Sequence, residues 1–146
     1  MKTILLFGAG KSATVLIDYL LDNAVIENWK VTVVDANLEL AQSKTAHSQK
    51  ATAVSFDILD ATEREKYIRQ ADIVISLLPP TLHIEVARDC VKYHRNLLTA
   101  SYVDDDIKKL EAEIAGNKLL FLCEMGLDPG IDHMSAMRII DGIHQS

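Results

Sequence analysis

The most constraining feature of the sequence is a glycine-containing turn, Gly8-Ala9-Gly10-Lys11-Ser12-Ala13, directly after the apolar run at 4–7. A helix pattern follows at once, with apolar residues three and four positions apart from 13 to 24. In such a strand-turn-helix unit the first glycine permits the tight turn, the second leaves room for a pyrophosphate, and alanine in third place lets the helix pack closely on the strand. The free amides at the helix start then face phosphate groups. The turn therefore predicts a dinucleotide-binding site, whereas the GxxxxGK[ST] spacing of a P-loop is absent.

The rest of the chain alternates between strand-like and helix-like hydrophobic patterns. Strands are expected at 4–7, 31–34, 51–56, 72–78, 96–101 and 118–123. Helices are expected between them, at 13–24, 36–46, 62–70, 82–91 and 107–114. Asp60 and the acidic run 104–106 are placed to cap the third and fifth of these helices. We therefore expect an α/β protein of the Rossmann type, a doubly wound parallel sheet of six strands in the order 3-2-1-4-5-6.

Length and charge limit the classes of partner. The 146 residues amount to one domain, and the apolar runs are too short to span a bilayer. The N-terminus lacks the cleavage site of a secretory signal, so we interpret it as a buried strand. A net charge of −6 would repel nucleic acid and anionic membranes. Cys90 and Cys123 have no CxxC spacing, which favours a reducing, cytoplasmic compartment and argues against a metal site.

An acid at the end of the second strand bears on the choice of coenzyme. Asp35 is placed to accept hydrogen bonds from the ribose hydroxyls of an adenosine, and its charge would repel a 2′-phosphate. The next residues, Ala36 and Asn37, supply no arginine to reverse this, so NAD is favoured over NADP. Asp57, which Ile58 follows, ends the third strand, where it either contacts the adenine or serves as a turn residue.

Leu77, Leu78 and Pro79 follow the fourth strand, at the point where the strand order reverses and ligands bind. They are expected to flank the ribose and nicotinamide of the coenzyme. His83 begins the next helix, from which it either reaches the reactive end of the coenzyme or is exposed to solvent; we expect an exposed histidine.

Polar residues also end the fifth and sixth strands, at Ser101-Tyr102 and at Glu124, and the irregular stretch GLDPG (126–130) follows. These segments form either half of a substrate site or a turn-rich exit from the sheet in which Asp132 caps a last helix. The only shift in composition falls at residue 126. We therefore divide the chain into a dinucleotide-binding domain at 1–125 and a substrate-site loop and helix at 126–146.

Four segments, ILLFGAGKSA, ADIVISLLPPTLH, LLTASYVDDDIKKLEAE and EMGLDPGIDHMSAM, resemble the N-terminal dinucleotide domain of the saccharopine dehydrogenase family, in particular its glutamate-forming reductases. The resemblance implies an oxidoreductase of lysine metabolism that transfers hydride reversibly between a nicotinamide and an imine or secondary amine joining two amino acids. It also implies that the glycine turn binds the pyrophosphate, that Leu77 to Pro80 border the nicotinamide, with Ser101 on the same rim, and that Tyr102 and Asp128 hold the amino-acid substrate. No metal is required.

Two features depart from that family. Its members continue into a second domain that binds the substrate and supplies the contacts of a homodimer, so this chain alone is expected to bind coenzyme without turnover. Several members prefer NADP, whereas Asp35 points to NAD. Two other functions stay open: a regulatory NAD(H)- or ATP-sensing domain of a potassium channel or transporter, and a related synthase that makes polyamine-type secondary amines. The regulatory domain would not need the TASY and GLDPG segments.

Overall fold

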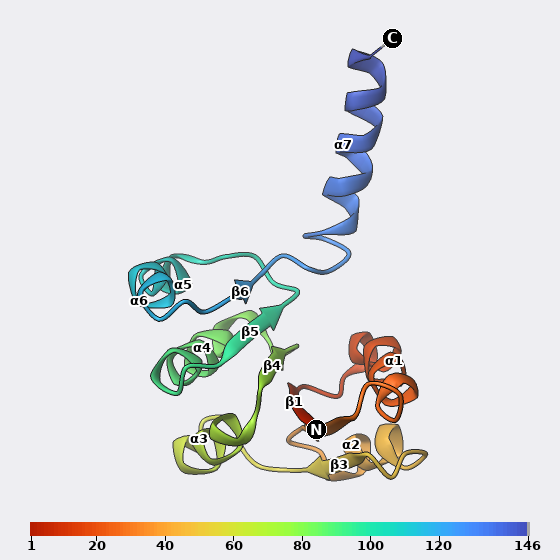
Figure 1. Cartoon of the computed structure of the whole chain (residues 1–146), viewed down its shortest axis with the longest axis vertical. Coiled ribbons are helices and arrows are strands. Elements are labelled where there is room, and N and C mark those ends of the chain that lie inside the picture. The colour runs from red at the N-terminus through yellow and green to blue at the C-terminus, as the bar shows by residue number, and fades with distance from the viewer. Residues whose placement is uncertain (146) are drawn as a thin grey trace.

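The computed structural model describes residues 1–145 and contains one sheet of six parallel strands, ordered β3-β2-β1-β4-β5-β6 (Figure 1). The fold class and strand order predicted from the sequence are therefore confirmed. The strands are β1 (Lys2–Phe7), β2 (Trp29–Val34), β3 (Ala51–Val54), β4 (Ile73–Ser76), β5 (Asn96–Thr99) and β6 (Phe121–Leu122). The predicted sixth strand at 118–123 is longer than the observed one. Lys118 has a φ of 54°, which turns the chain, and within the described residues 1–145 β6 pairs with β5 alone, at the sheet edge.

Helices connect the strands in the predicted positions. They are α1 (Thr14–Asn23), α2 (Leu38–Thr45), α3 (Ala61–Gln70), α4 (His83–Lys92), α5 (Asp105–Lys108), α6 (Glu111–Gly116) and α7 (Ile131–His144). Asp60 and Asp104 accept backbone N–H groups at the starts of α3 and α5, as expected from their sequence positions. The single helix predicted at 107–114 is instead divided into α5 and α6, because the Leu110 N–H donates to the Ile107 carbonyl (3.0 Å) in a tighter turn.

The buried residues of the strands alternate between two faces of the sheet. Ile4 and Leu6 of β1 belong to a cluster on the face covered by α1 and α2, whereas Leu5 and Phe7 belong to the cluster under α3, α4 and α5. Figure 1 shows the two groups of helices on opposite sides of the sheet. Burial on both faces explains the continuous apolar runs of the central strands. It also holds the carboxyl ends of the strands in a fixed array along one edge.

The chain leaves the sheet after β6 and ends in α7, which projects away from the rest of the molecule (Figure 1). No residue of α7 is buried, and Ile139 is 65% exposed. Within residues 1–145, no helix has the length and apolar character required to cross a membrane. The proposed division of the chain near residue 126 stays a prediction.

Candidate functional site

The glycine turn lies between β1 and α1, as expected, and its first glycine is sterically required. Gly8 has a φ of 98°, and a Cβ placed there would lie 2.7 Å from the Leu77 carbonyl oxygen. Gly10, in contrast, has open space where its Cβ would be. A short 3₁₀ turn at Lys11–Ala13 precedes α1, and its first internal bond runs from the Ala13 N–H to the Gly10 carbonyl (3.1 Å). The amides before that bond are not used by the helix, so they are available to a phosphate.

Asp35 lies just after β2 and hydrogen-bonds to the turn. One carboxylate oxygen accepts the Ala9 N–H (2.7 Å) and the other accepts the Asn37 N–H (2.9 Å). Each oxygen keeps a further lone pair, which a ribose hydroxyl can use. Because the Ala9 amide is donated to Asp35, the phosphate-facing donors of the turn are those from Gly10 onwards.

Lys44 of α2 is a cation near the turn that the sequence analysis missed. Its ammonium donates to the Gly10 carbonyl (3.0 Å) and also hydrogen-bonds to the Thr14 hydroxyl. Thr14 in turn donates to the Lys11 carbonyl (3.0 Å), so α1, α2 and the turn are joined by one polar cluster. The separation of 34 positions between Gly10 and Lys44 leaves no local signal that could have predicted the contact.

The predicted coenzyme residues mostly line one cleft of about 410 Å³ at the carboxyl edge of the sheet. Predicted residues on its walls are Gly8, Gly10, Asp35, Ala36, Asp57, Ile58, Leu77, Leu78 and Pro79. Four predicted residues of the turn lie elsewhere, and the first of them, Ala9, is fully buried. Lys11 is exposed, Ala13 is buried under the turn, and Ser12 lines a separate apolar hollow between α1 and the 125–134 segment. Ser101 lies in a further pocket, described below.

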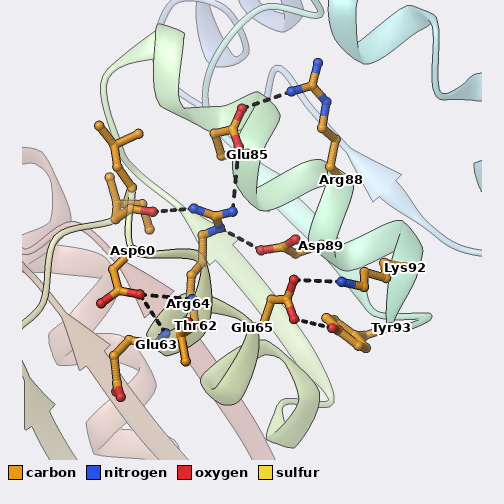
Figure 2. A network of polar contacts seen from close by, with 12 residues as sticks. Asp60, Thr62, Glu63, Arg64, Glu65, Glu85, Arg88, Asp89, Lys92 and Tyr93 are labelled. Atoms are coloured by element: carbon orange, nitrogen blue, oxygen red, sulfur yellow. Dashed lines mark hydrogen bonds and ion pairs between the residues drawn. The ribbon is translucent and has the colours of Figure 1, made fainter.

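A buried arginine holds the loop after β3 against α4 (Figure 2). The Nε of Arg64 is 2.6 Å from an Asp89 carboxylate oxygen, and its guanidinium also donates to the Ile58 carbonyl (2.5 Å). Glu85 is a more distant partner at 3.6 Å. Since Asp57 and Ile58 form one wall of the cleft, this ion pair fixes that wall. Burial raises the pKa of the Asp89 carboxyl, and the attraction of Arg64 opposes this shift.

A second pocket, of about 420 Å³, lies beside the cleft and contains the two predicted substrate residues, Tyr102 and Asp128. The Tyr102 hydroxyl donates to the Asp128 carboxylate (2.7 Å), and this bond raises the pKa of Tyr102 to about 12. Tyr102 is therefore protonated at neutral pH and acts as a donor rather than as a base. Ser101 lines the same pocket.

His83 is buried, so the expectation that it is exposed was wrong. It is only 4% exposed, and both ring nitrogens have partners: Nδ1 lies 2.8 Å from the Ser76 hydroxyl and Nε2 lies 2.7 Å from the Ser101 hydroxyl. Histidines at helix starts are often solvated, but here β4 and β5 deliver hydroxyls to either side of the ring. Burial lowers the pKa of His83, and the charge of Asp104 opposes that shift.

Because the pKa of His83 is lower in the folded chain than its usual 6.5, we expect the protein to lose stability as the pH falls below about 6.5. In that range the unfolded chain binds a proton at this histidine and the folded chain does not. Urea unfolding at about pH 7.5 and about pH 5.5 measures the loss, and His83→Gln should make it smaller. Burial raises the pKa of Asp89, so this residue has the opposite effect on the pH dependence of stability, but it is present in both the unmodified protein and the variant. An equal pH dependence of the two chains would contradict the expectation.

The GLDPG loop closes on itself before α7 begins. The Gly126 N–H donates to the Pro129 carbonyl (2.9 Å) and the Ile131 N–H to the Gly126 carbonyl (3.0 Å). Asp132 lies inside the first turn of α7 rather than at its cap position, which Gly130 occupies, and it accepts the Gly130 N–H (3.0 Å). The loop thus holds Asp128 next to Tyr102 at the rim formed by β5 and β6.

The strand order, the glycine turn and the acid after β2 define a Rossmann domain of the class that binds dinucleotides. The chain belongs to the saccharopine dehydrogenase NADP binding domain family, whose profile matches residues 4–121. This confirms the family resemblance drawn from the sequence.

Relatives with known names support this assignment. The chain is 35% identical over 145 residues to the saccharopine dehydrogenase [NADP(+), L-glutamate-forming] of Saccharomyces cerevisiae, covering 99% of this chain and 32% of that protein. It is 41% identical over 120 residues to the alpha-aminoadipic semialdehyde synthase of Arabidopsis thaliana, covering 81% of this chain and 11% of that protein. The structure of the apo yeast saccharopine dehydrogenase (L-Glu forming) superposes with a TM-score of 0.88 at 35% identity, over 99% of this chain and 32% of that one. The chain thus spans about a third or less of these relatives.

Proposed function

We propose that the chain is the coenzyme-binding part of a saccharopine dehydrogenase-like oxidoreductase of lysine metabolism. The reaction is a reversible hydride transfer between a nicotinamide and an imine or secondary amine that joins two amino acids. The single observation that carries the proposal is the cleft in which the Gly8–Gly10 turn lies next to the Asp35 carboxylate. The family match favours this function over a regulatory domain, and the names of the relatives favour it over a polyamine-type synthase.

The coenzyme we propose is NAD rather than NADP. The family and the yeast relative are described by NADP, which makes binding of a nicotinamide dinucleotide the broader expectation. The finer choice depends on Asp35, whose charge at the ribose position opposes a 2′-phosphate. Among the residues that line the cleft there is no lysine or arginine to compensate it.

We expect NADH to bind this chain at least about tenfold tighter than NADPH, a difference of about 1.4 kcal/mol. Asp35→Asn should reduce the ratio of the two dissociation constants by roughly tenfold, because the repelling charge is removed. Asp57→Asn is the matched control, since it removes an equal charge from the same cleft and should leave the ratio unchanged. Calorimetric titration measures the dissociation constants of both coenzymes for each variant. Any change that a variant causes in the glycine turn affects NADH and NADPH equally, so it cancels in their ratio.

Tighter binding of NADPH by the unmodified chain would overturn the choice of NAD. Binding of neither coenzyme at saturating concentration would overturn the proposed function as a whole.

The roles of individual residues follow from the same proposal. When bound, the coenzyme supplies the hydride, and the chain positions its two halves and excludes water. The free N–H groups of Gly10, Lys11 and Ser12 hold the pyrophosphate, with Ala13 packed beneath them, and Leu77, Leu78 and Pro79 border the nicotinamide. Tyr102 and Asp128 hold the amino-acid substrate on the rim by accepting hydrogen bonds from its amino groups, because the single hydroxyl hydrogen of Tyr102 is already donated to Asp128.

The remaining parts of the proposal concern the protein beyond this domain. The chain matches about a third of the yeast relative, so the substrate-binding domain and the homodimer are proposed to lie outside the residues that match. The segment 126–146 leads toward that domain, and residues 1–125 bind the coenzyme. The chain alone is accordingly expected to bind coenzyme without turnover. The cytoplasmic location rests on the two free cysteines, Cys90 and Cys123.

A further inference from the structure

His83 lies between two hydroxyl groups that come from neighbouring strands. Ser76 ends β4 and is fully buried, and its hydroxyl lies 2.8 Å from Nδ1. Ser101 follows β5, is half-buried, and has its hydroxyl 2.7 Å from Nε2. The hydroxyl of Thr99 is a longer contact of Nε2, at 3.4 Å. The arrangement is a chain of three polar groups that begins in the core and ends in the pocket of Tyr102 and Asp128.

The donors and acceptors in this hydrogen-bonded series can be assigned from the number of protons that each group carries. A neutral imidazole donates through one nitrogen and accepts through the other. Over residues 1–145, the Ser76 hydroxyl has no hydrogen-bond partner other than Nδ1. If Nδ1 carried the proton, the Ser76 hydrogen would be buried without an acceptor, which is costly. Ser76 therefore donates to Nδ1, the imidazole proton is on Nε2, and Nε2 donates to the oxygen of Ser101.

This direction leaves the hydrogen of the Ser101 hydroxyl free for a ligand. Ser101 uses its oxygen as the acceptor for His83, and its backbone N–H is donated to the Thr99 hydroxyl (3.3 Å). Since Ser101 lines the second pocket, its O–H is a fixed donor at the pocket wall. Burial also lowers the pKa of His83, which keeps the imidazole in the neutral form that this arrangement needs.

The charge of the pocket limits the acceptor that Ser101 can serve. The ionisable carboxyls that line the pocket are Asp104 and Asp128, and no lysine or arginine is among its lining residues. An anionic acceptor such as a carboxylate would be repelled there. A neutral carbonyl oxygen is favoured. A primary carboxamide fits best, because its carbonyl oxygen can accept from the Ser101 hydroxyl and its amino group can donate to a carboxylate of the pocket.

We propose that His83 is a positioning residue, which fixes the Ser101 hydroxyl as a hydrogen-bond donor to the carboxamide carbonyl of a nicotinamide ring. This inference rests on the proposed function, because it assigns the second pocket to the nicotinamide end of the coenzyme. It adds a role for a buried side chain that does not itself touch the ligand.

The test compares NADH with ADP-ribose, which lacks the nicotinamide, in calorimetric titrations. Ser101→Ala and His83→Phe should each weaken NADH binding roughly threefold to tenfold, the effect of one uncharged hydrogen bond. ADP-ribose affinity should stay within about twofold. The double variant should bind NADH no more weakly than either single variant, because both changes remove the same hydrogen bond, the one from the Ser101 hydroxyl to the ligand. His83→Gln keeps a side-chain amide donor and should recover part of the affinity, whereas His47→Gln, at an exposed histidine after α2, should have no effect.

The outcomes separate this inference from the function on which it rests. If the unmodified chain binds neither NADH nor ADP-ribose, the proposed function fails and the inference with it. If Ser101→Ala weakens both ligands equally, or neither, the role of Ser101 is refuted while the proposed function stands. Loss of ADP-ribose binding in His83→Phe would indicate a folding defect. The decision then rests on Ser101→Ala and on ¹⁵N NMR of the unmodified chain, where a proton on Nδ1 rather than Nε2 would contradict the proposal.

Discussion

Gly8→Ala is expected to destabilise the chain by roughly 2–5 kcal/mol and to abolish measurable NADH binding. The added Cβ would lie 2.7 Å from the carbonyl oxygen of Leu77 and 3.0 Å from its carbonyl carbon. Neither backbone can move freely, because the Gly8 N–H donates to Val34 (2.8 Å) and the Leu77 N–H donates to Phe7 (2.8 Å). The φ of 98° adds strain for any residue with a Cβ. Urea unfolding and calorimetric titration measure the two losses.

Gly10→Ala separates binding from stability in the same turn. No atom lies within 4 Å of a Cβ at Gly10, so the fold should be retained within about 1 kcal/mol. The methyl group would instead take up space next to the expected pyrophosphate, and NADH binding should fall at least about tenfold. Gly142→Ala, in the last turns of α7, is the control that should change neither property adversely. Full stability in Gly8→Ala, or full NADH affinity in Gly10→Ala, would show that the turn has been misinterpreted.

The parts of the fold that the sequence predicted well are those with strong local signals. Hydrophobic runs such as ILLF mark strands covered on both faces, and acids such as Asp60 mark helix starts by satisfying free amides. The glycine turn was predicted because a positive φ and a close backbone contact require a residue without a Cβ. The strand order follows from the handedness of parallel crossovers once the elements are known.

The parts that could not be predicted depend on contacts between residues far apart in the sequence. The buried His83 contacts Ser76 at the end of β4 and Ser101 after β5, which are 7 and 18 positions away in the sequence. Lys44 reaches the glycine turn from another helix, and the division between α5 and α6 has no glycine or proline to mark it. The predicted residues that line the cleft come together because the parallel sheet places the carboxyl ends of β1, β2, β3 and β4 side by side. Ser12 and Ser101 face other cavities, and Ala9, Lys11 and Ala13 do not line the cleft, so a motif position alone does not indicate where a side chain lies.

Arg64→Met is expected to reduce the free energy of unfolding by about 3–5 kcal/mol, a large share of the stability of a small domain. Arg64 is 4% exposed and Asp89 is 6% exposed, so the change leaves a carboxylate buried without its cation. The Ile58 carbonyl also loses its donor. Because that carbonyl belongs to the wall of the coenzyme cleft, NADH affinity should fall in the fraction that stays folded. Lys66→Met, at an exposed cation of the same helix that pairs with Glu63, is the control and should cost less than about 1 kcal/mol.

Two further measurements test whether the buried charge is the cause. Arg64→Met combined with Asp89→Leu should regain most of the lost stability, because no charge is then buried, and Glu85 keeps Arg88 as a partner at 3.0 Å. The loss in Arg64→Met alone should also shrink as the pH falls. The pKa of Asp89 is already raised by burial, and it rises further without the opposing attraction of Arg64. Protonation then removes the buried charge in the folded chain, so a lower pH stabilises this variant relative to the unmodified protein. A loss that is independent of pH and unchanged by Asp89→Leu would mean that Arg64 acts through packing of its side chain rather than through the ion pair.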